Sequence, residues 1–176
     1  MPSEVYMQTK TDIDTMEKVN ELIKDIRITM MTTIDEGGSP RSRPMHTHEA
    51  EFDGDLWFMT GANSSNAREI RNNSRVNLGY ASTSNERYVS VTGDAKILND
   101  RAKIKEFWSP FLKAWWEGPD DPDIRLIKVS VEQVEYWDTP GGKIASVLSI
   151  VKSAITGTPD NSGENETIDL KANKRR

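Results

Sequence analysis

Cysteine is absent from the sequence, and histidine occurs only twice, at His46 and His48. Without cysteine there are no disulfide bonds, no thiol nucleophile and no zinc site built on thiolates. The two histidines share one face of an extended strand, but they supply only two ligands, and no third ligand has a suitable spacing. We therefore predict no metal site.

Long apolar runs and excess positive charge are also missing. No run approaches the roughly 18 apolar residues of a membrane-spanning helix, and the first residues do not resemble a secretory signal. Lys and Arg number 23 against 28 Asp and Glu, so the formal net charge is -5 at pH 7. Clustered positive charge is what a general nucleic-acid surface needs. We expect a cytoplasmic protein without a membrane or nucleic-acid partner.

Three common glycine motifs are absent as well. The sequence contains no G-x-S-x-G elbow, no P-loop and no G-x-G-x-x-G fingerprint. A hydrolase with a serine nucleophile on a G-x-S-x-G elbow is therefore not expected. A bound nucleotide cofactor would not be held in the Rossmann manner.

The 176 residues are enough for one domain with its own core. Residues 1–10 are expected to be flexible, residues 11–155 to form the domain, and residues 156–176, rich in polar residues and glycine, to be a disordered tail. Apolar residues at helical spacing predict a first helix from Ile13 to Ile26 and a last one over residues 144–155.

Six segments between these helices have the alternation or β-branched content of strands. They are residues 28–34, 41–46, 56–60, 75–81, 87–98 and 124–138. Asp53-Gly54 is a strong hairpin signal, so we expect the first three strands to form an antiparallel meander. Asp100 is expected to cap a helix that carries an aromatic stripe from Ile104 to Trp116 and a kink at Pro110.

This pattern predicts a mainly β, α+β fold: a six-stranded antiparallel barrel, closed or nearly closed, with peripheral helices. A two-layer α+β sandwich is the alternative, because periodicity does not separate the two.

The segment from Arg41 to Arg71 carries the candidate site. Arg41 and Arg43 share one strand face. The polar loop from Gly61 to Asn66 opens a helix, and backbone N–H groups at a helix start attract anions. We predict a phosphate site here, although Ser64-Ser65 also fits a plain helix N-cap.

Several segments in this order resemble the general stress protein 26 family of pyridoxamine 5'-phosphate oxidase-like, FMN-binding split barrels. The resemblance covers roughly residues 15–155. Its most specific parts are Ala114-Trp115-Trp116 before the Gly/Pro/Asp break and Val134-Glu135-Tyr136-Trp137-Asp138. The segments RSRPM, LWFMT and SSNAREIR, beginning at Arg41, Leu56 and Ser64, occur in the matching order.

The resemblance implies a homodimer with two flavin sites at the interface, with FMN as the cofactor and FAD or another flavin as alternatives. Arg41 and Arg43 would contact the phosphate or ribityl chain, and Ser64 and Ser65 the phosphate. The partner subunit would contribute segments matching Tyr88–Ser90, Trp115-Trp116 and Trp137. The implied cofactor-binding residues are Arg41, Arg43, Pro44, Met45, Phe58, Met59, Thr60, Ser64, Ser65, Asn66, Trp115, Trp116 and Trp137.

Two departures from the related oxidases bear on function. Asn66 stands where they usually have a lysine, and a lost charge-assisted hydrogen bond costs about 1.5–3 kcal/mol. No histidine follows Trp137, whereas the oxidases grip pyridoxal phosphate with an Arg and His motif there, so pyridoxamine phosphate oxidation is not expected.

The resemblance implies a flavin-dependent oxidoreductase acting with a small-molecule redox partner. A non-enzymatic flavin store or stress sensor is the alternative, and a barrel that has lost its flavin is a third reading. No side chain stands out as an acid or base, so no catalytic residue is assigned.

Overall fold

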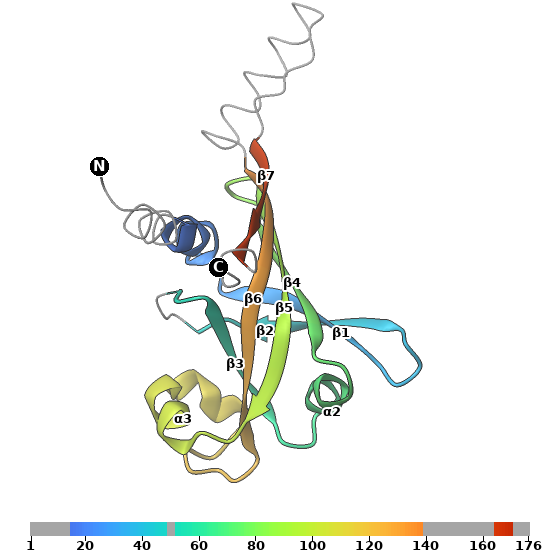
Figure 1. The fold of residues 1–176 in the computed structure, drawn as a ribbon. Helices are drawn as coiled ribbons and strands as arrows, with labels where there is room; N and C mark the ends of the chain where they lie inside the picture. Colours follow the sequence, from blue (N-terminus) through green and yellow to red (C-terminus); the bar gives the residue numbers. More distant parts are fainter. Residues whose placement is uncertain (1–14, 49–51, 139–163, 171–176) are drawn as a thin grey trace, which may run out of the picture.

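The computed structural model describes residues 15–48, 52–138 and 164–170. Their strands form one antiparallel sheet (Figure 1). In chain order the strands are β1 (Ile28–Ile34), β2 (Pro40–His46), β3 (Asp55–Gly61), β4 (Arg75–Ser82), β5 (Arg87–Leu98), β6 (Ile124–Asp138) and β7 (Glu164–Asp169). The helices are residues 15–23, α2 (Ser65–Asn72), α3 (Arg101–Phe107) and the 3-10 helix η1 (Pro110–Ala114).

The strand order in the sheet is β2-β1-β4-β5-β6-β3, and β7 pairs with the C-terminal half of β6. β1 and β2 form the predicted hairpin. The predicted meander is wrong, because β3 pairs with β6 from Asp55 opposite Ser130 to Gly61 opposite Ile124. Gly54 does adopt a turn conformation with φ +101°, but its carbonyl accepts from the amide of Val131. The Asp53-Gly54 turn therefore leads β3 onto β6 and not back onto β2.

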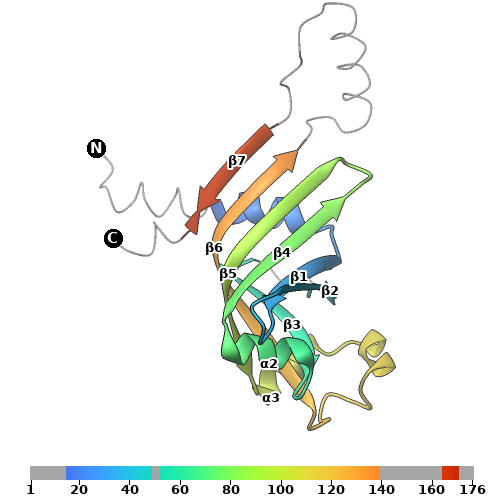
Figure 2. The ribbon, with the colours of Figure 1, turned by 90° about the vertical axis from the view of Figure 1, so that its right-hand side faces the viewer.

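The mainly β, α+β fold is confirmed, and the two-layer sandwich is not what forms. A single sheet curls, with the long strands β5 and β6 running along the molecule and β1 and β2 crossing behind them (Figures 1 and 2). β2 and β3 are the ends of the strand order, yet both reach the same pocket. The curl thus brings the two ends of the sheet together.

Alternation along the strands builds the main core. Met31, Phe58, Leu78, Val91 and Val129 are buried inside the curled sheet. The first helix lies against this core as predicted, through the buried side chains of Val19, Leu22 and Ile23. It ends at residue 23, before the predicted end at Ile26, and Ile26 joins the core from the segment that follows the helix. None of the helices in the described residues has the length and hydropathy that crossing a bilayer requires.

A smaller second core lies beneath the aromatic segment and contains Met59, Ile104, Leu112, Ile124 and Leu126. The segment above it is not the single kinked helix that its stripe predicts. α3 stops at Phe107, and Trp108 and Ser109 are extended before Pro110 opens η1. The reason is steric, because a proline ring disfavours helical backbone at the preceding residue.

The prediction of a disordered tail is wrong for residues 164–169. These residues form β7, which pairs antiparallel with β6 from Gln133 to Asp138. Ile168 packs against the main core, and Leu170 is 2% exposed within it. Residues 1–10, the predicted helix over 144–155 and the rest of the predicted tail lie outside the described residues.

Leu170→Ala is expected to lower the free energy of unfolding by about 2–3 kcal/mol, because it leaves a cavity in the core. Thr167→Ala, at an exposed position of β7 shortly before Leu170, is the matched control and should change little. Urea unfolding followed by far-UV circular dichroism measures both. Equal midpoints for Leu170→Ala and the wild type would contradict the packing of β7 on the core.

Candidate functional site

A pocket of about 250 Å³ opens where the ends of β2 and β3 meet η1. Its walls are aromatic rings and methionine side chains, and its polar groups are hydroxyl, amide and imidazole groups. Residues that line it are Pro44, Met45, His46, His48, Met59, Thr60, Gly61, Asn66, Phe111, Leu112, Trp115 and Trp116. We call it the β2–β3 pocket. None of these described lining residues is an Asp, Glu, Lys or Arg.

The aromatic side chains at the rim of the β2–β3 pocket are unusually exposed. Phe111 is 55% and Trp115 is 61% exposed, and their ring centroids lie 5.0 Å apart. Both follow Pro110, which begins η1 and turns this segment over the second core. Large apolar groups at a pocket mouth are typical of a surface that another molecule covers.

The floor of the pocket is a closed hydrogen-bond network on the polar loop. Asn66 Oδ1 accepts from the hydroxyls of Thr60 (2.8 Å) and Ser64 (2.5 Å) and from the amide of Ala67 (2.9 Å). Asn66 Nδ2 faces the sulfur of Met45 at 3.6 Å. Ser64 is also the N-cap of α2, as its sequence context predicts. Asn66 is buried, so its amide is held in one orientation.

The two arginines predicted to bind phosphate already have acidic partners. Arg41 Nε lies 3.0 Å from Asp35 Oδ2. Arg43 Nη2 lies 2.7 Å from Glu69 Oε2, and Arg43 Nη1 donates to Thr33 Oγ1 at 2.8 Å. Neither arginine lines the β2–β3 pocket.

Glu69 is the acidic partner with the more buried environment. Burial by itself raises its pKa, but the hydrogen bonds from Thr33 and Arg43 outweigh burial and bring the pKa below its ordinary value. Glu69 is therefore ionised at neutral pH and forms a true ion pair with Arg43.

A second small cavity, of about 270 Å³, lies at the start of α2. It is lined by Asp35, Glu36, Gly37, Ser65, Arg68 and Glu69. Of its three carboxylates, Asp35 already pairs with Arg41 and Glu69 with Arg43, which leaves Glu36 beside Arg68. Ser65, which the resemblance places on the phosphate, lies here and not in the β2–β3 pocket.

Seven of the predicted site residues share the pocket: Pro44, Met45, Met59, Thr60, Asn66, Trp115 and Trp116. Ser64 lies directly behind it through Thr60 and Asn66. Phe58, which was expected beside the flavin, does not line the pocket, because its side chain is fully buried in the main core. Trp137 is placed elsewhere as well, on β6 opposite Tyr88 of β5. Trp115 and Trp116, implied to come from the partner, line a pocket of their own subunit.

Sequence reasoning missed His46, His48, Phe111, Leu112 and Gly61 as lining residues. A signal was available for His46, because alternation along β2 places it on the face of Pro44. Its ring lies 5.3 Å from that of Phe111, and His48 stacks on Phe107 at 4.6 Å. Within the described ranges, no three metal-ligating side chains gather into a possible metal site.

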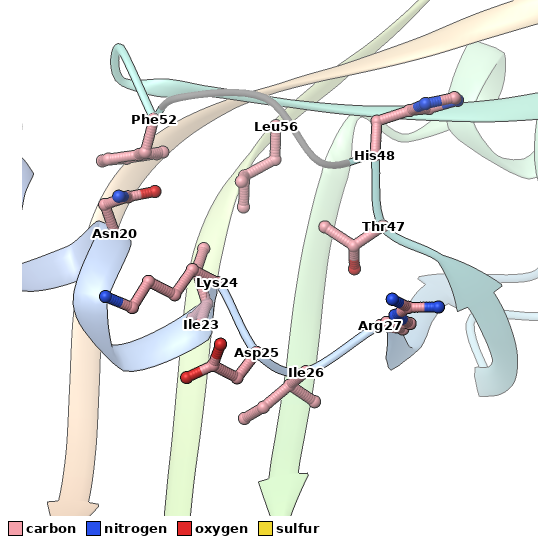
Figure 3. Close-up of a pocket in the computed structure, with 10 residues that line it drawn as sticks. All are labelled: Asn20, Ile23, Lys24, Asp25, Ile26, Arg27, Thr47, His48, Phe52 and Leu56. Atoms are coloured by element: carbon pink, nitrogen blue, oxygen red, sulfur yellow. The ribbon is translucent and has the colours of Figure 1, made fainter. Parts of the chain in front are cut away.

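A larger cavity of about 510 Å³ lies on the other side of His48, between the first helix and β3 (Figure 3). Asn20, Ile23 and Lys24 face Thr47 and Leu56 across it, and the ring of His48 points away from them. That ring belongs to the β2–β3 pocket, where it contacts Phe107.

Burial, helped by the charge of His46, lowers the pKa of His48 from 6.5 to about 4. Because the unfolded chain binds a proton that the folded chain does not, stability should be complete above pH 6.5 and fall as the pH drops toward 4. Histidine NMR titration checks the pKa, and His48→Gln should flatten the stability profile in this window. His46→Gln, the control, removes only the second cause and should raise the pKa of His48 slightly. A His48 that titrates near 6.5 would contradict this description of the pocket.

The family model described as "Pyridoxamine 5'-phosphate oxidase like" matches residues 14–161. The chain is 28% identical to Protein bli-3 of Neurospora crassa over 174 residues, which is 90% of this chain and 83% of that protein. It is 32% identical to general stress protein 26 of Bacillus subtilis over 129 residues, covering 71% of this chain and 89% of the relative.

One similar solved structure is the general stress FMN/FAD binding protein of Xanthomonas citri. It has a TM-score of 0.60 and 26% identity, and the match covers 70% of this chain and 87% of that chain. The fold, the family model and the relatives agree with the resemblance drawn from the sequence segments. The chain belongs to the pyridoxamine 5'-phosphate oxidase-like family.

Proposed function

We propose that this protein is a cytoplasmic, flavin-binding oxidoreductase that holds FMN or another flavin in the β2–β3 pocket and works as a homodimer. The observation that carries the proposal is the chemistry of the pocket, which pairs exposed aromatic rings with a fixed, uncharged polar floor. The relative in Xanthomonas citri is named for FMN/FAD binding, and this supports a flavin as the ligand.

The pocket residues fit the ring system of a flavin. A flat heteroaromatic ring stacks on aromatic side chains, and Trp115 and Trp116 offer such surfaces. Met45 and Met59 supply polarizable contacts that tolerate an irregular edge. Thr60 and Asn66 place polar atoms at the floor, where they would orient a ring edge by hydrogen bonds.

A bound flavin supplies the redox chemistry, and the protein supplies position and environment. The network among Thr60, Ser64 and Asn66 keeps the floor rigid. His48 is neutral at pH 7, since its pKa is about 4, so it adds no positive charge beside the ring. Leu112 and Phe111 would exclude water from one side.

The small volume of the β2–β3 pocket and the exposed aromatic side chains at its mouth support completion of the pocket by a second subunit. A pocket for a drug-sized ligand usually has about 300–1,000 Å³ and encloses most of the ligand. The β2–β3 pocket has about 250 Å³ in one chain, and Phe111 and Trp115 stand exposed at its mouth. A second surface laid over this mouth would enlarge and close it.

The outer face of the sheet offers such a surface. Exposed Ile28 lies opposite His46 of the pocket. Further along the same face, exposed Tyr88 lies between Ala81 and exposed Trp137. Large apolar side chains therefore extend across the sheet from the pocket, and Met30 adds a further one beside Pro44. A self-complementary apolar face of this kind suits a two-fold dimer.

FMN titration, followed by quenching of flavin fluorescence, tests the ligand. Trp115→Ala should weaken binding about tenfold, because it removes one stacking surface. Trp57→Ala, on β3 but outside the pocket lining, is the matched control and should bind as the wild type does. Wild-type protein that is folded and fails to bind any flavin would refute the proposal.

Reduction of the bound flavin by NADH or NADPH would separate an enzyme from a storage protein.

Met30→Asp should convert the dimer to a monomer, because it places a charge in the apolar face without entering the core. Lys96→Asp, also exposed but on the distant half of β5, should leave the dimer intact. Sedimentation velocity at several protein concentrations measures both. A wild-type monomer at tens of micromolar, or a dimeric Met30→Asp variant, would contradict the assigned interface.

A further inference from the structure

The turn at residues 118–123 joins the wall of the β2–β3 pocket to its floor. It comes shortly after Trp115 and Trp116 of the wall, and it leads into β6 at Ile124. This turn is the Gly/Pro/Asp break that the sequence places after the aromatic stripe. Its last residue, Asp123, contacts the polar loop that carries the floor.

Asp123 holds the polar loop at the amide of Ala62. That N–H group donates to the main-chain oxygen of Asp123 at 2.7 Å and to the carboxylate oxygen Oδ1 at 3.1 Å. A carboxylate is a stronger acceptor for an N–H group than a neutral oxygen. The carbonyl of Ala62 accepts from Arg71 of α2 at 3.0 Å. Ala62 is therefore held by the turn on one side and by α2 on the other.

Gly61, which lines the pocket, lies against the carboxylate of Asp123. A Cβ atom at this position would be 2.8 Å from Asp123 Oδ2, so the close approach depends on the absence of a side chain. Gly61 also pairs with Ile124 at the end of β3. A displacement of the carboxylate would therefore reach the pocket lining through Gly61.

Arg101, at the start of α3, fixes the turn from behind. Its guanidinium donates to the carbonyl of Asp121 at 2.8 Å and to that of Ile124 at 2.7 Å, on either side of Asp123 along the chain. The amide of Asp123 donates to Asp121 Oδ1 at 2.9 Å. Asp123 thus meets the polar loop from a well-held position.

We propose that Asp123 is a positioning residue for the flavin, because it fixes the polar loop relative to the wall formed by Trp115 and Trp116. The inference rests on the proposed function and names a residue outside the pocket lining on which the site depends. Asp123 does not line the pocket, so it acts through Gly61 and Ala62. A floor that is fixed before the ligand arrives loses less conformational freedom on binding, which favours affinity.

FMN titrations of Asp123 variants test this role. Asp123→Ala should weaken FMN binding about fivefold, with a thermal midpoint close to that of the wild type because the side chain is exposed. The visible circular dichroism of the flavin-saturated variant should also change, whereas a purely structural role would lower only the thermal midpoint. Asp123→Asn keeps an acceptor oxygen for Ala62 and should restore FMN affinity to within about twofold of the wild type.

Asp120→Ala is the matched control from the same turn. It removes only an exposed ion pair with Lys105, which contributes little, so its FMN affinity should equal that of the wild type. An Asp123→Ala variant that binds FMN as tightly as this control would overturn the inference and leave the proposed function intact. If folded wild-type protein binds no flavin, the proposed function fails, and this inference fails with it.

A double-variant cycle tests whether Asp123 acts through Gly61. Gly61→Ala should weaken FMN binding, because its methyl group displaces the carboxylate of Asp123. In the Asp123→Ala background the same methyl group should weaken binding less than about twofold. Two independent effects that multiply would show that the methyl group acts on the pocket directly, and this result would also overturn the inference.

Discussion

The ion pair between Arg43 and Glu69 ties three parts of the molecule together. Arg43 belongs to β2 and Glu69 to α2, and Thr33 of β1 bonds to both. This contact holds α2 against the hairpin, and α2 in turn positions Ser64 and Asn66 at its start. The floor of the β2–β3 pocket therefore depends on a charge pair outside it.

Much of the fold follows from local patterns. The alternation after Asp123 predicts β6 with the bounds that the structure has, Ile124–Asp138, and the apolar stripe around Val19 predicts the first helix. Pairing of β3 with β6 was not predictable, because a strong turn signal at Asp53-Gly54 says nothing about partners far along the chain. β7 was not predictable because its sequence is mostly polar, and only Ile168 and the following Leu170 contact the core there.

The candidate site was predictable in its residue types but not in its charge balance. Met45, Thr60 and Trp116 were identified from matching segments, and the curl of the sheet brings them together. The acidic partners of the two arginines were not, because Asp35 lies in the turn between β1 and β2 and Glu69 lies 26 residues after Arg43. Phe58 was misplaced because a segment match does not say which strand face a side chain takes.

The most direct test of the flavin-binding dimer is gel filtration of the wild-type protein after incubation with riboflavin or FMN, with visible absorbance recorded across the profile. Flavin absorbance is expected to co-elute with a protein peak at twice the chain mass of 19.9 kDa. Flavin that elutes only with small molecules, away from folded protein, would contradict it.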